Sequence, residues 1–342
     1  KQMKINILLL LLITACLSCS KKTDSKTEKY HQNRDFIVNI QDQVKEIVIE
    51  DVFISNISWL NLIDDYLIVA DYHSDDKLIH LFDKNNFNYI TSTTSRGLGP
   101  GEIANVGRIA INEGKRTFHV LDHGKQKVFS FQLDSILINP DYKPEETTSI
   151  DKTQFPVDFQ ILNDTFAIAL VFQPIGNADY KPVVAKWNMI NGEIIPMKYS
   201  HSEIEKKRIN SAASIENDIY VECYWHHDLM TICSLNGELK YNVYGPKWNN
   251  EKTNRVSYYR DVIFVNDKIL VLYYDGNDTF YSKTKANYPT KFILFDIEGN
   301  YLKTLETGYK ITSICFDKEN NRIIMLLDDE IQFAYFSIDG IA

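Results

Sequence analysis

The segment His226-His227-Asp228 is a candidate for metal or acid–base chemistry. Side chains of adjacent strand residues point to opposite faces, so the two histidines cannot bind one ion unless the backbone bends sharply. The chain contains neither H-E-x-x-H, as in zinc hydrolases, nor G-x-S-x-G, as in serine hydrolases. We therefore expect no metal site, no cofactor and no catalytic serine.

A second polar group falls in segments expected to be short strands lining a channel: Arg108, Asp158, Asn210, Arg260 and Asp261. Ca²⁺ prefers several carboxylate and amide oxygens, which Asp158, Asn210 and Asp261 could supply. The two arginines would place positive charge beside such an ion. A channel-centred calcium hydrolase therefore stays open only as an alternative.

A glycine-rich segment runs Arg96-Gly97-Leu98-Gly99-Pro100-Gly101-Glu102. It matches neither G-x-x-x-x-G-K-[ST] nor a G-x-G-x-x-G that opens a helix, because Pro100 interrupts it and the following residues are strand-like. Glycines allow positive-φ turns between strands. We interpret the segment as a structural loop that Arg96 or Glu102 ties to a neighbouring repeat.

The elements that must position these residues are repeated strands. Acidic or amide turn pairs recur at intervals of 48 to 54 residues, close to the period of four-stranded propeller blades. The six pairs are Asp64-Asp65, Asn112-Glu113, Asn163-Asp164, Asn217-Asp218, Asn266-Asp267 and Asp317-Lys318. Each precedes an apolar run typical of a strand buried on both faces. The pattern predicts an all-β, six-bladed β-propeller with four-stranded antiparallel blades.

The sixth repeat lacks a fourth strand, because the sequence reaches only Ala342. The segment 36–53 is rich in β-forming residues and belongs to no repeat. We predict that part of it supplies the outer strand of the last blade, which closes the ring and covers an edge that would otherwise promote aggregation.

The first twenty residues resemble a secretion signal: Lys4, an apolar run over 8–13, then small residues and Cys16. The run is shorter than the roughly 20 residues of a spanning helix. Ile13-Thr14-Ala15-Cys16 is similar to a bacterial lipobox, with Cys19 as the alternative lipidation site. We predict a signal over 1–19, a flexible tether over 20–35 and one propeller domain over 36–342.

Composition limits the partners and the redox chemistry. The formal charge is −9, and an acidic chain is a poor nucleic-acid ligand. Three cysteines lie outside the leader, Cys223, Cys233 and Cys315, an odd number without C-x-x-C spacing. We interpret them as buried hydrophobic residues, with a Cys223–Cys233 disulfide as the alternative. We expect a monomer that binds no nucleic acid.

The segment 96–102, together with the leader and the repeats, resembles six-bladed β-propeller lipoproteins common in Bacteroidota, related to NHL-like and TolB-like propellers. The resemblance covers nearly the whole chain. It implies a propeller fold, secretion, and a general binding role at the cell envelope, but no catalytic residues. We expect a lipid-anchored protein at the outer membrane, facing either the periplasm or the surface.

In this fold the loops after each second strand share a face with the connections between blades, and functional groups concentrate on such loops. The predicted ligand-binding residues are His73, Asp75, Arg96, Glu102, Arg108, His123, Trp225, His226, Trp248, Arg260, Tyr274 and Asp275. The aromatic residues would stack on a ligand and the arginines would bind anionic groups.

The leading functional hypothesis is a non-enzymatic binding module for a peptide, protein or glycan. The alternatives are a hydrolase or lyase acting on a sugar or lactone in the channel, and a structural subunit of an envelope complex.

Overall fold

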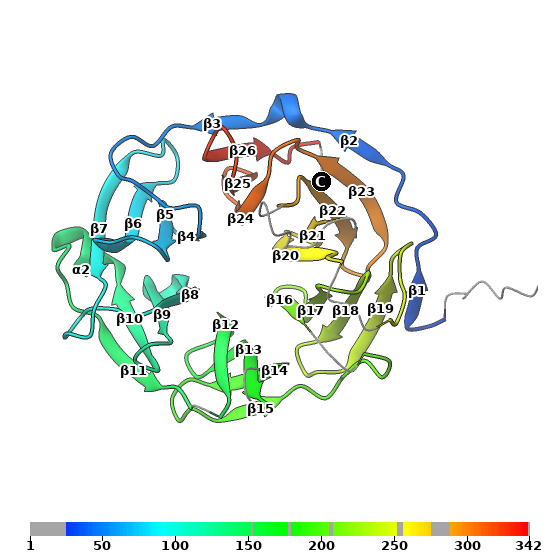
Figure 1. The fold of residues 1–342 in the computed structure, drawn as a ribbon, viewed down its shortest axis with the longest axis horizontal. Helices are drawn as coiled ribbons and strands as arrows, with labels where there is room; N and C mark the ends of the chain where they lie inside the picture. Colours follow the sequence, from blue (N-terminus) through cyan, green and yellow to red (C-terminus); the bar gives the residue numbers. More distant parts are fainter. Residues whose placement is uncertain are drawn as a thin grey trace, which may run out of the picture.

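The computed structural model describes residues 25–151, 153–176, 179–204, 208–251, 256–274 and 288–340. Six sheets are arranged around a common axis (Figure 1), which confirms the predicted six-bladed all-β propeller. A cavity of about 470 Å³ lies on this axis and is lined by residues of all six innermost strands, so the ring encloses a central channel.

Each blade is an antiparallel sheet that begins with its innermost strand. Blade 1 consists of β4 (Ser58–Ile63), β5 (Tyr66–Asp71), β6 (Lys77–Asp83) and β7 (Tyr89–Ser95). Blade 2 consists of β8 (Val106–Asn112), β9 (Thr117–Asp122), β10 (Lys127–Gln132) and β11 (Glu145–Ser149). Blade 3 consists of β12 (Phe155–Ile161), β13 (Phe166–Pro174), β14 (Tyr180–Asn188) and β15 (Ile194–Pro196).

The second half of the ring repeats this order. Blade 4 consists of β16 (Ile209–Ser214), β17 (Ile219–Tyr224), β18 (Leu229–Ser234) and β19 (Leu239–Tyr244). Blade 5 consists of β20 (Tyr259–Val265), β21 (Lys268–Tyr273), β22 (Lys291–Asp296) and β23 (Tyr301–Glu306). Blade 6 consists of β24 (Ile311–Asp317), β25 (Arg322–Leu327), β26 (Phe333–Ser337) and β3 (Lys45–Ile47).

The six predicted turn pairs all lie where the first strand of a blade turns into the second, with Asn112 and Asp317 as the last residues of their first strands. Asp64, Asp218 and Asn266 have φ angles of 49°, 53° and 54° there. Aspartate and asparagine tolerate this left-handed conformation better than other non-glycine residues, which is why they recur at these turns. We call the face that carries these turns the hairpin face.

The core consists of apolar layers between neighbouring blades. Between blades 6 and 1, for example, Leu67 and Val69 of β5 pack with Ile324, Leu326 and Phe333. Because both faces of the second strand of each blade are covered by such layers, its sequence is a nearly continuous apolar run. The three cysteines, Cys223, Cys233 and Cys315, are free and buried in these layers, as the preferred interpretation predicted.

The N-terminal segment runs along the outside of three blades (Figure 1). Strand β3 pairs antiparallel with β26, which confirms the predicted closure. Two further pairings were not predicted, because the segment 36–53 was expected to join only the last blade and residues before it were expected to form no strand. Strand β1 (Glu28–Tyr30) adds in parallel to β19, and β2 (Ile37–Asn39) adds in parallel to β23.

The expectation of a flexible tether over residues 20–35 is therefore wrong from Glu28 onward. The segment is held by main-chain hydrogen bonds, by Tyr30, which stacks at 4.4 Å on Tyr244, and by the buried side chain of Arg34. These contacts need no regular spacing of apolar residues, so the sequence of the segment shows no apolar periodicity. The earlier part of the predicted tether, residues 20–24, lies outside the described residues.

Among the residues that the structure describes, regular helix is confined to short pieces: α2 (Leu133–Ile138), which buries Leu133 and Ile136, and the 3₁₀ turns η1 (Gln41–Gln43) and η2 (Glu113–Lys115). Within the described ranges, none of the helices has the length and apolar character needed to cross a bilayer.

Candidate functional site

The starts of the inner strands gather a set of charged and aromatic side chains at one mouth of the channel. Because every blade repeats the same strand order, all inner strands enter from one face, here called the entry face. This face also carries the loops 72–76, 123–126 and 225–228, the connection 96–105, and residues 245–251 and 256–258 of the connection after β19. The inner-strand residues near this mouth are Trp59, Arg108, Asp158, Asn210, Arg260 and Asp261.

Irregular strand pairing shapes this mouth. The register between first and second strands shifts in β8, β12, β20 and β24, each time near the start of the strand. Such bulges twist a strand and redirect its side chains, and they are common beside binding sites. The shift in β12 lies directly before Asp158, and the shift in β20 includes Arg260.

Asp158 is the most perturbed acid of the mouth. Its carboxylate lies 3.6 Å from Nε of Arg108, and 36% of its side chain remains exposed to the channel. Desolvation by the surrounding protein raises the pKa of Asp158 to about 6. The negative charge of Asp261 raises this pKa further, and the positive charge of Arg108 lowers it. At neutral pH this carboxylate is close to its titration midpoint, so it can exchange a proton or respond to a bound charge.

We expect the Asp158 carboxyl to titrate with a midpoint near pH 6, measured by ¹³C NMR and assigned with Asp158→Asn. Arg108→Ala should raise the midpoint, and Asp261→Asn should lower it. Because the folded pKa exceeds the unfolded value of about 3.9, the associated stability is fully present below pH ~4 and is lost as the pH rises through the folded midpoint. A midpoint at or below 4 would contradict this account.

Four arginines of the entry face stack on aromatic rings. The guanidinium of Arg108 lies 5.4 Å from the ring centre of Trp59, and Arg96 lies 6.0 Å from Tyr72. Arg208 and Arg260 each lie 5.4 Å from the ring centre of Trp225. Cation–π contact with an indole is favourable and restricts the orientation of the guanidinium plane. These stacks hold the positive charges of the mouth in defined positions.

The sequence prediction missed two members of this group, Trp59 and Arg208. Trp59 sits in an apolar strand pattern, and Arg208 lies in a charged stretch with no recognisable motif. Neither position carries a local signal, because the partner of each cation–π contact lies in another strand or loop.

The glycine-rich loop is tied to a neighbouring repeat, but by the side chain of Lys125 and not by that of Arg96 or Glu102 as we expected. The main-chain N–H of Gly99 donates to the Glu102 carboxylate over 2.6 Å, and Gly101 has a φ of 83°. Lys125 of blade 2 donates to the carbonyls of Gly99 and Glu102 over 2.8 and 2.7 Å, which ties the loop to the next blade. Arg96 donates to the carbonyl of Tyr72.

The remaining predicted ligand residues differ in exposure. His73 and Asp75 are exposed on the loop after β5, and His123 is half-buried against Phe155. Buried aspartates organise these loops: Asp71 accepts from the main chain of Ser55 and His73, and Asp122 accepts from residues 104, 105, 124 and 125.

Two predicted residues, His226 and Tyr274, are buried rather than at the mouth, and a third, Trp248, is half-buried against other aromatic residues. His226 is buried, and its Nδ1 donates to the carbonyl of Val256 over 2.7 Å; burial lowers its pKa. Tyr274 is also buried. Trp248 packs on Tyr244, His201 and His227. The site proposed below therefore omits these three.

Other predicted positions fall beyond what the structure describes. Asp275 and the lipidation candidates Cys16 and Cys19 lie outside the described residues. Within the described parts of the chain, no three or more His, Cys, Asp or Glu side chains form a group that could hold a metal ion. The adjacent histidines bond two different points of the connection after β19, since His226 Nδ1 donates to the carbonyl of Val256 and His227 Nδ1 donates to that of Asn249 over 3.2 Å.

Comparison with known proteins identifies the fold. A family profile described as a six-bladed beta-propeller matches residues 48–159. No curated protein matches the chain.

Solved structures with the same fold include two from Bacteroides. A member of the DUF4221 family from Bacteroides vulgatus has a TM-score of 0.53 at 11% identity, covering 87% of this chain and 98% of that one. A putative exported protein from Bacteroides fragilis has a TM-score of 0.52 at 10% identity, covering 91% and 98%. The Cps50 (Swd1) propeller domain from Myceliophteria thermophila has a TM-score of 0.53 at 10% identity, covering 86% and 99%. At these identities the similarity shows the fold alone.

Proposed function

We propose that this protein is a non-enzymatic binding module that takes a carboxylate-bearing peptide or glycan at the entry-face mouth of its channel. The observation that carries the proposal is the pair Arg208 and Arg260, both stacked at 5.4 Å on Trp225. A guanidinium in a fixed plane is suited to bind a carboxylate with two parallel hydrogen bonds.

The rest of the mouth supports a ligand with both anionic and polar groups. Arg108 and Asp158 face the same channel and are 28% and 36% exposed, so solvent-borne groups can reach both. Asp158 and Asp261 would accept hydrogen bonds from hydroxyl or amide groups, while an acidic group binds the arginines. Positive and negative side chains held in one mouth favour one orientation of the bound ligand. They contribute more to this specificity than to the affinity for the ligand.

Location at the cell envelope, with a lipid on Cys16 or Cys19, is part of the same proposal. It is supported by the leader of the sequence and by the similarity to a Bacteroides fragilis protein that is itself named as a putative exported protein. The closer relationship to NHL-like and TolB-like lipoproteins rests on the sequence resemblance.

The test is a screen of peptide and glycan arrays followed by calorimetry on the best ligand and on its carboxamide analogue. We expect Arg208→Ala and Arg260→Ala each to weaken binding at least tenfold, because a charged hydrogen-bonded contact contributes about 1.5–3 kcal/mol. Arg208→Lys should recover little, since lysine lacks the planar guanidinium.

The matched control is Lys303→Ala, which removes a cation 5.9 Å from Phe36 on the outside of blade 5. It should bind as the wild type does. Arginine variants with unchanged affinity, or equal affinity for the carboxylate and carboxamide forms, would contradict the proposed mouth.

A channel hydrolase or lyase is a second candidate, favoured only by the raised pKa of Asp158, about 6, which would suit a general acid or base. Turnover of lactones or uronate-containing oligosaccharides that Asp158→Asn abolishes, without loss of binding, would establish it. Turnover unaffected by that change would exclude Asp158 as the catalytic residue.

A further inference from the structure

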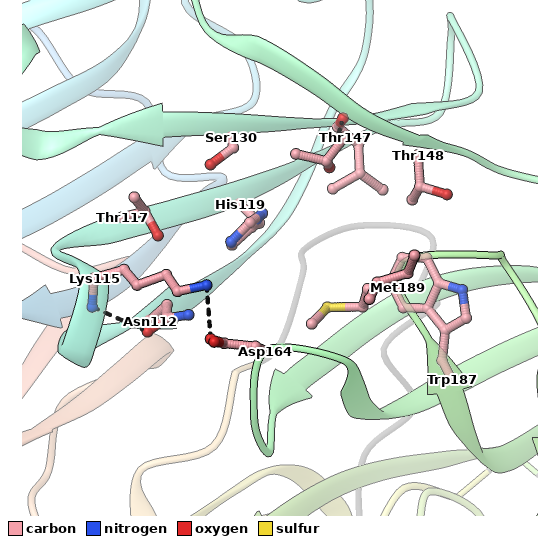
Figure 2. A pocket seen from close by; sticks show the side chains of 12 residues that line it. Asn112, Lys115, Thr117, His119, Ser130, Thr147, Thr148, Asp164, Trp187 and Met189 are labelled. Atoms are coloured by element: carbon pink, nitrogen blue, oxygen red, sulfur yellow. Dashed lines mark hydrogen bonds and ion pairs between the residues drawn. The ribbon is translucent and has the colours of Figure 1, made fainter.

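A second cavity lies between blades 2 and 3, away from the entry-face mouth. It has a volume of about 340 Å³ and is bordered on the hairpin face by residues of the turns after β8 and β12 (Figure 2). It is lined mainly by Thr117, His119, Ser130, Thr148, Met189 and Trp187. Cavities of a few hundred Å³ are typical of small-ligand sites.

This cavity interrupts the apolar packing that joins the blades elsewhere. The third residue of the second strand is apolar in five blades: Ile68, Ile168, Val221, Leu270 and Ile324. In blade 2 it is His119. The residue paired with it on the next strand is Ser130, where blades 1, 4 and 5 have Leu81, Ile232 and Leu294.

Polar residues at such positions reduce the stability that an apolar layer would provide. A departure from the repeat pattern without a structural gain is characteristic of functional sites. The opposite face of the same blade keeps the pattern, since Phe118, Val120, Phe129 and Phe131 pack towards blade 1. Within blade 2, the replacement of apolar by polar residues is therefore confined to the face that borders the cavity.

The cavity offers hydrogen-bonding groups without net charge. Among the described residues, the side chains of Thr117, His119, Ser130 and Thr148 have no hydrogen-bond partner in the protein. Lys115 and Asp164, at the border of the cavity, pair with each other at 2.8 Å (Figure 2). Burial, reinforced by Lys115, lowers the pKa of His119 to about 4, so its imidazole is neutral at physiological pH and has one donor and one acceptor nitrogen.

We propose that this cavity binds a neutral polyhydroxylated ligand, namely a single sugar unit. The hydroxyls of Thr117, Ser130 and Thr148 and the imidazole of His119 would exchange hydrogen bonds with sugar hydroxyls. Val128 and Met189 provide an apolar wall for the C–H face of the ring. This site is separate from the channel mouth and does not depend on the function proposed for it.

The experiment is a saturation-transfer NMR and calorimetric titration of the full chain. The probes are glucose, galactose, mannose and N-acetylglucosamine, with glucuronate and glucosamine as charged analogues. We expect at least one neutral sugar to bind saturably, to shift the imidazole resonances of His119, and to bind better than its charged analogues.

The principal variant is His119→Ile, which gives blade 2 the residue type found in the other blades. We expect it to raise the melting temperature by a few degrees, because it fills a cavity with an apolar side chain, and to weaken sugar binding at least tenfold. Thr148→Val removes one hydroxyl with little change in shape and should weaken binding less. Arg260→Ala, at the channel mouth, should leave sugar binding unchanged.

Three results would overturn the proposal. They are the absence of saturable binding by every neutral sugar, binding that persists in a folded His119→Ile variant, and stronger binding of the charged analogues to a variant whose channel mouth is disabled by Arg208→Ala and Arg260→Ala. A more stable His119→Ile variant combined with no sugar binding would show that the cavity is only a packing defect. If the channel mouth binds no carboxylate ligand but a neutral sugar still binds and His119→Ile abolishes that binding, the proposed function fails and the cavity proposal stands.

Discussion

Replacing Arg34 by alanine is expected to lower the free energy of unfolding by about 3–5 kcal/mol, because it leaves a buried carboxylate without a counter-charge. Arg34 Nη1 lies 2.8 Å from Oδ1 of Asp228, and the two side chains are 6% and 0% exposed. Tyr259 joins the pair by accepting from Arg34 over 3.0 Å and donating to Asp228 over 2.8 Å. The pair therefore locks the N-terminal segment onto blades 4 and 5.

The measurement is equilibrium unfolding in denaturant, with Lys318→Ala as the matched control. Lys318 pairs with Glu216 at the same 2.8 Å, but these side chains are 61% and 70% exposed. Exposed pairs contribute about 0–1 kcal/mol, so the control should remain near the wild type. Asp228→Asn in the Arg34→Ala background should recover part of the loss. A loss below 1 kcal/mol in Arg34→Ala would contradict a buried ion pair.

Replacing Ile47 by aspartate is expected to open the ring, with a loss of more than about 4 kcal/mol and a shift of the protein into aggregates. Ile47 is 5% exposed and packs with Ile324, Leu326 and Phe333 between blades 6 and 1. It also pairs with Phe333 in the register of β3 and β26. A charge there would release β3 and expose the edge of β26, which is a template for association with other chains.

The control for Ile47→Asp is Glu46→Lys, one residue earlier in the same strand, where the side chain is exposed. Because alternate residues of an outer strand face solvent, this change should leave both solubility and unfolding midpoint nearly unchanged. Both variants can be compared by size-exclusion chromatography and thermal melting. Deletion of residues 33–53 should cause at least the loss seen with Ile47→Asp. A soluble deletion variant with an unchanged melting temperature would disprove the closure.

The propeller could be predicted because its information is local. Turn residues at a regular interval and apolar runs after each turn depend only on neighbouring residues, and Asp64 and Asn266 indeed adopt the left-handed turn conformation. The closing strand could be predicted because the segment 36–53 is rich in β-forming residues and belongs to no repeat. Strands β1 and β2 could not, since their pairing uses main-chain groups and single side chains such as Arg34, whose partner is 194 residues away.

The candidate site was predicted in part. Arg108, Asp158, Arg260 and Trp225 were predicted as ligand-facing or inner-strand residues, and the structure places them around the entry-face mouth. His226 and Tyr274 have the same polar or aromatic character, yet they are buried, and Trp248 is half-buried against Tyr244 and two histidines. Residue type and loop position do not distinguish these cases, because burial depends on how closely neighbouring blades approach.

Sequence alone therefore determined the number and order of the blades, the positions of their turns and the closing strand, since each depends on patterns within one repeat. Only the tertiary structure decided which side chains meet across blades: Arg108 with Asp158, Arg34 with Asp228, and the polar wall around His119. Those contacts arise when the closed ring brings neighbouring repeats, and the N-terminal segment that runs outside them, together: Arg108 and Asp158 are 50 residues apart, and Arg34 and Asp228 are 194 apart. A pattern within one repeat carries no information about such distant partners.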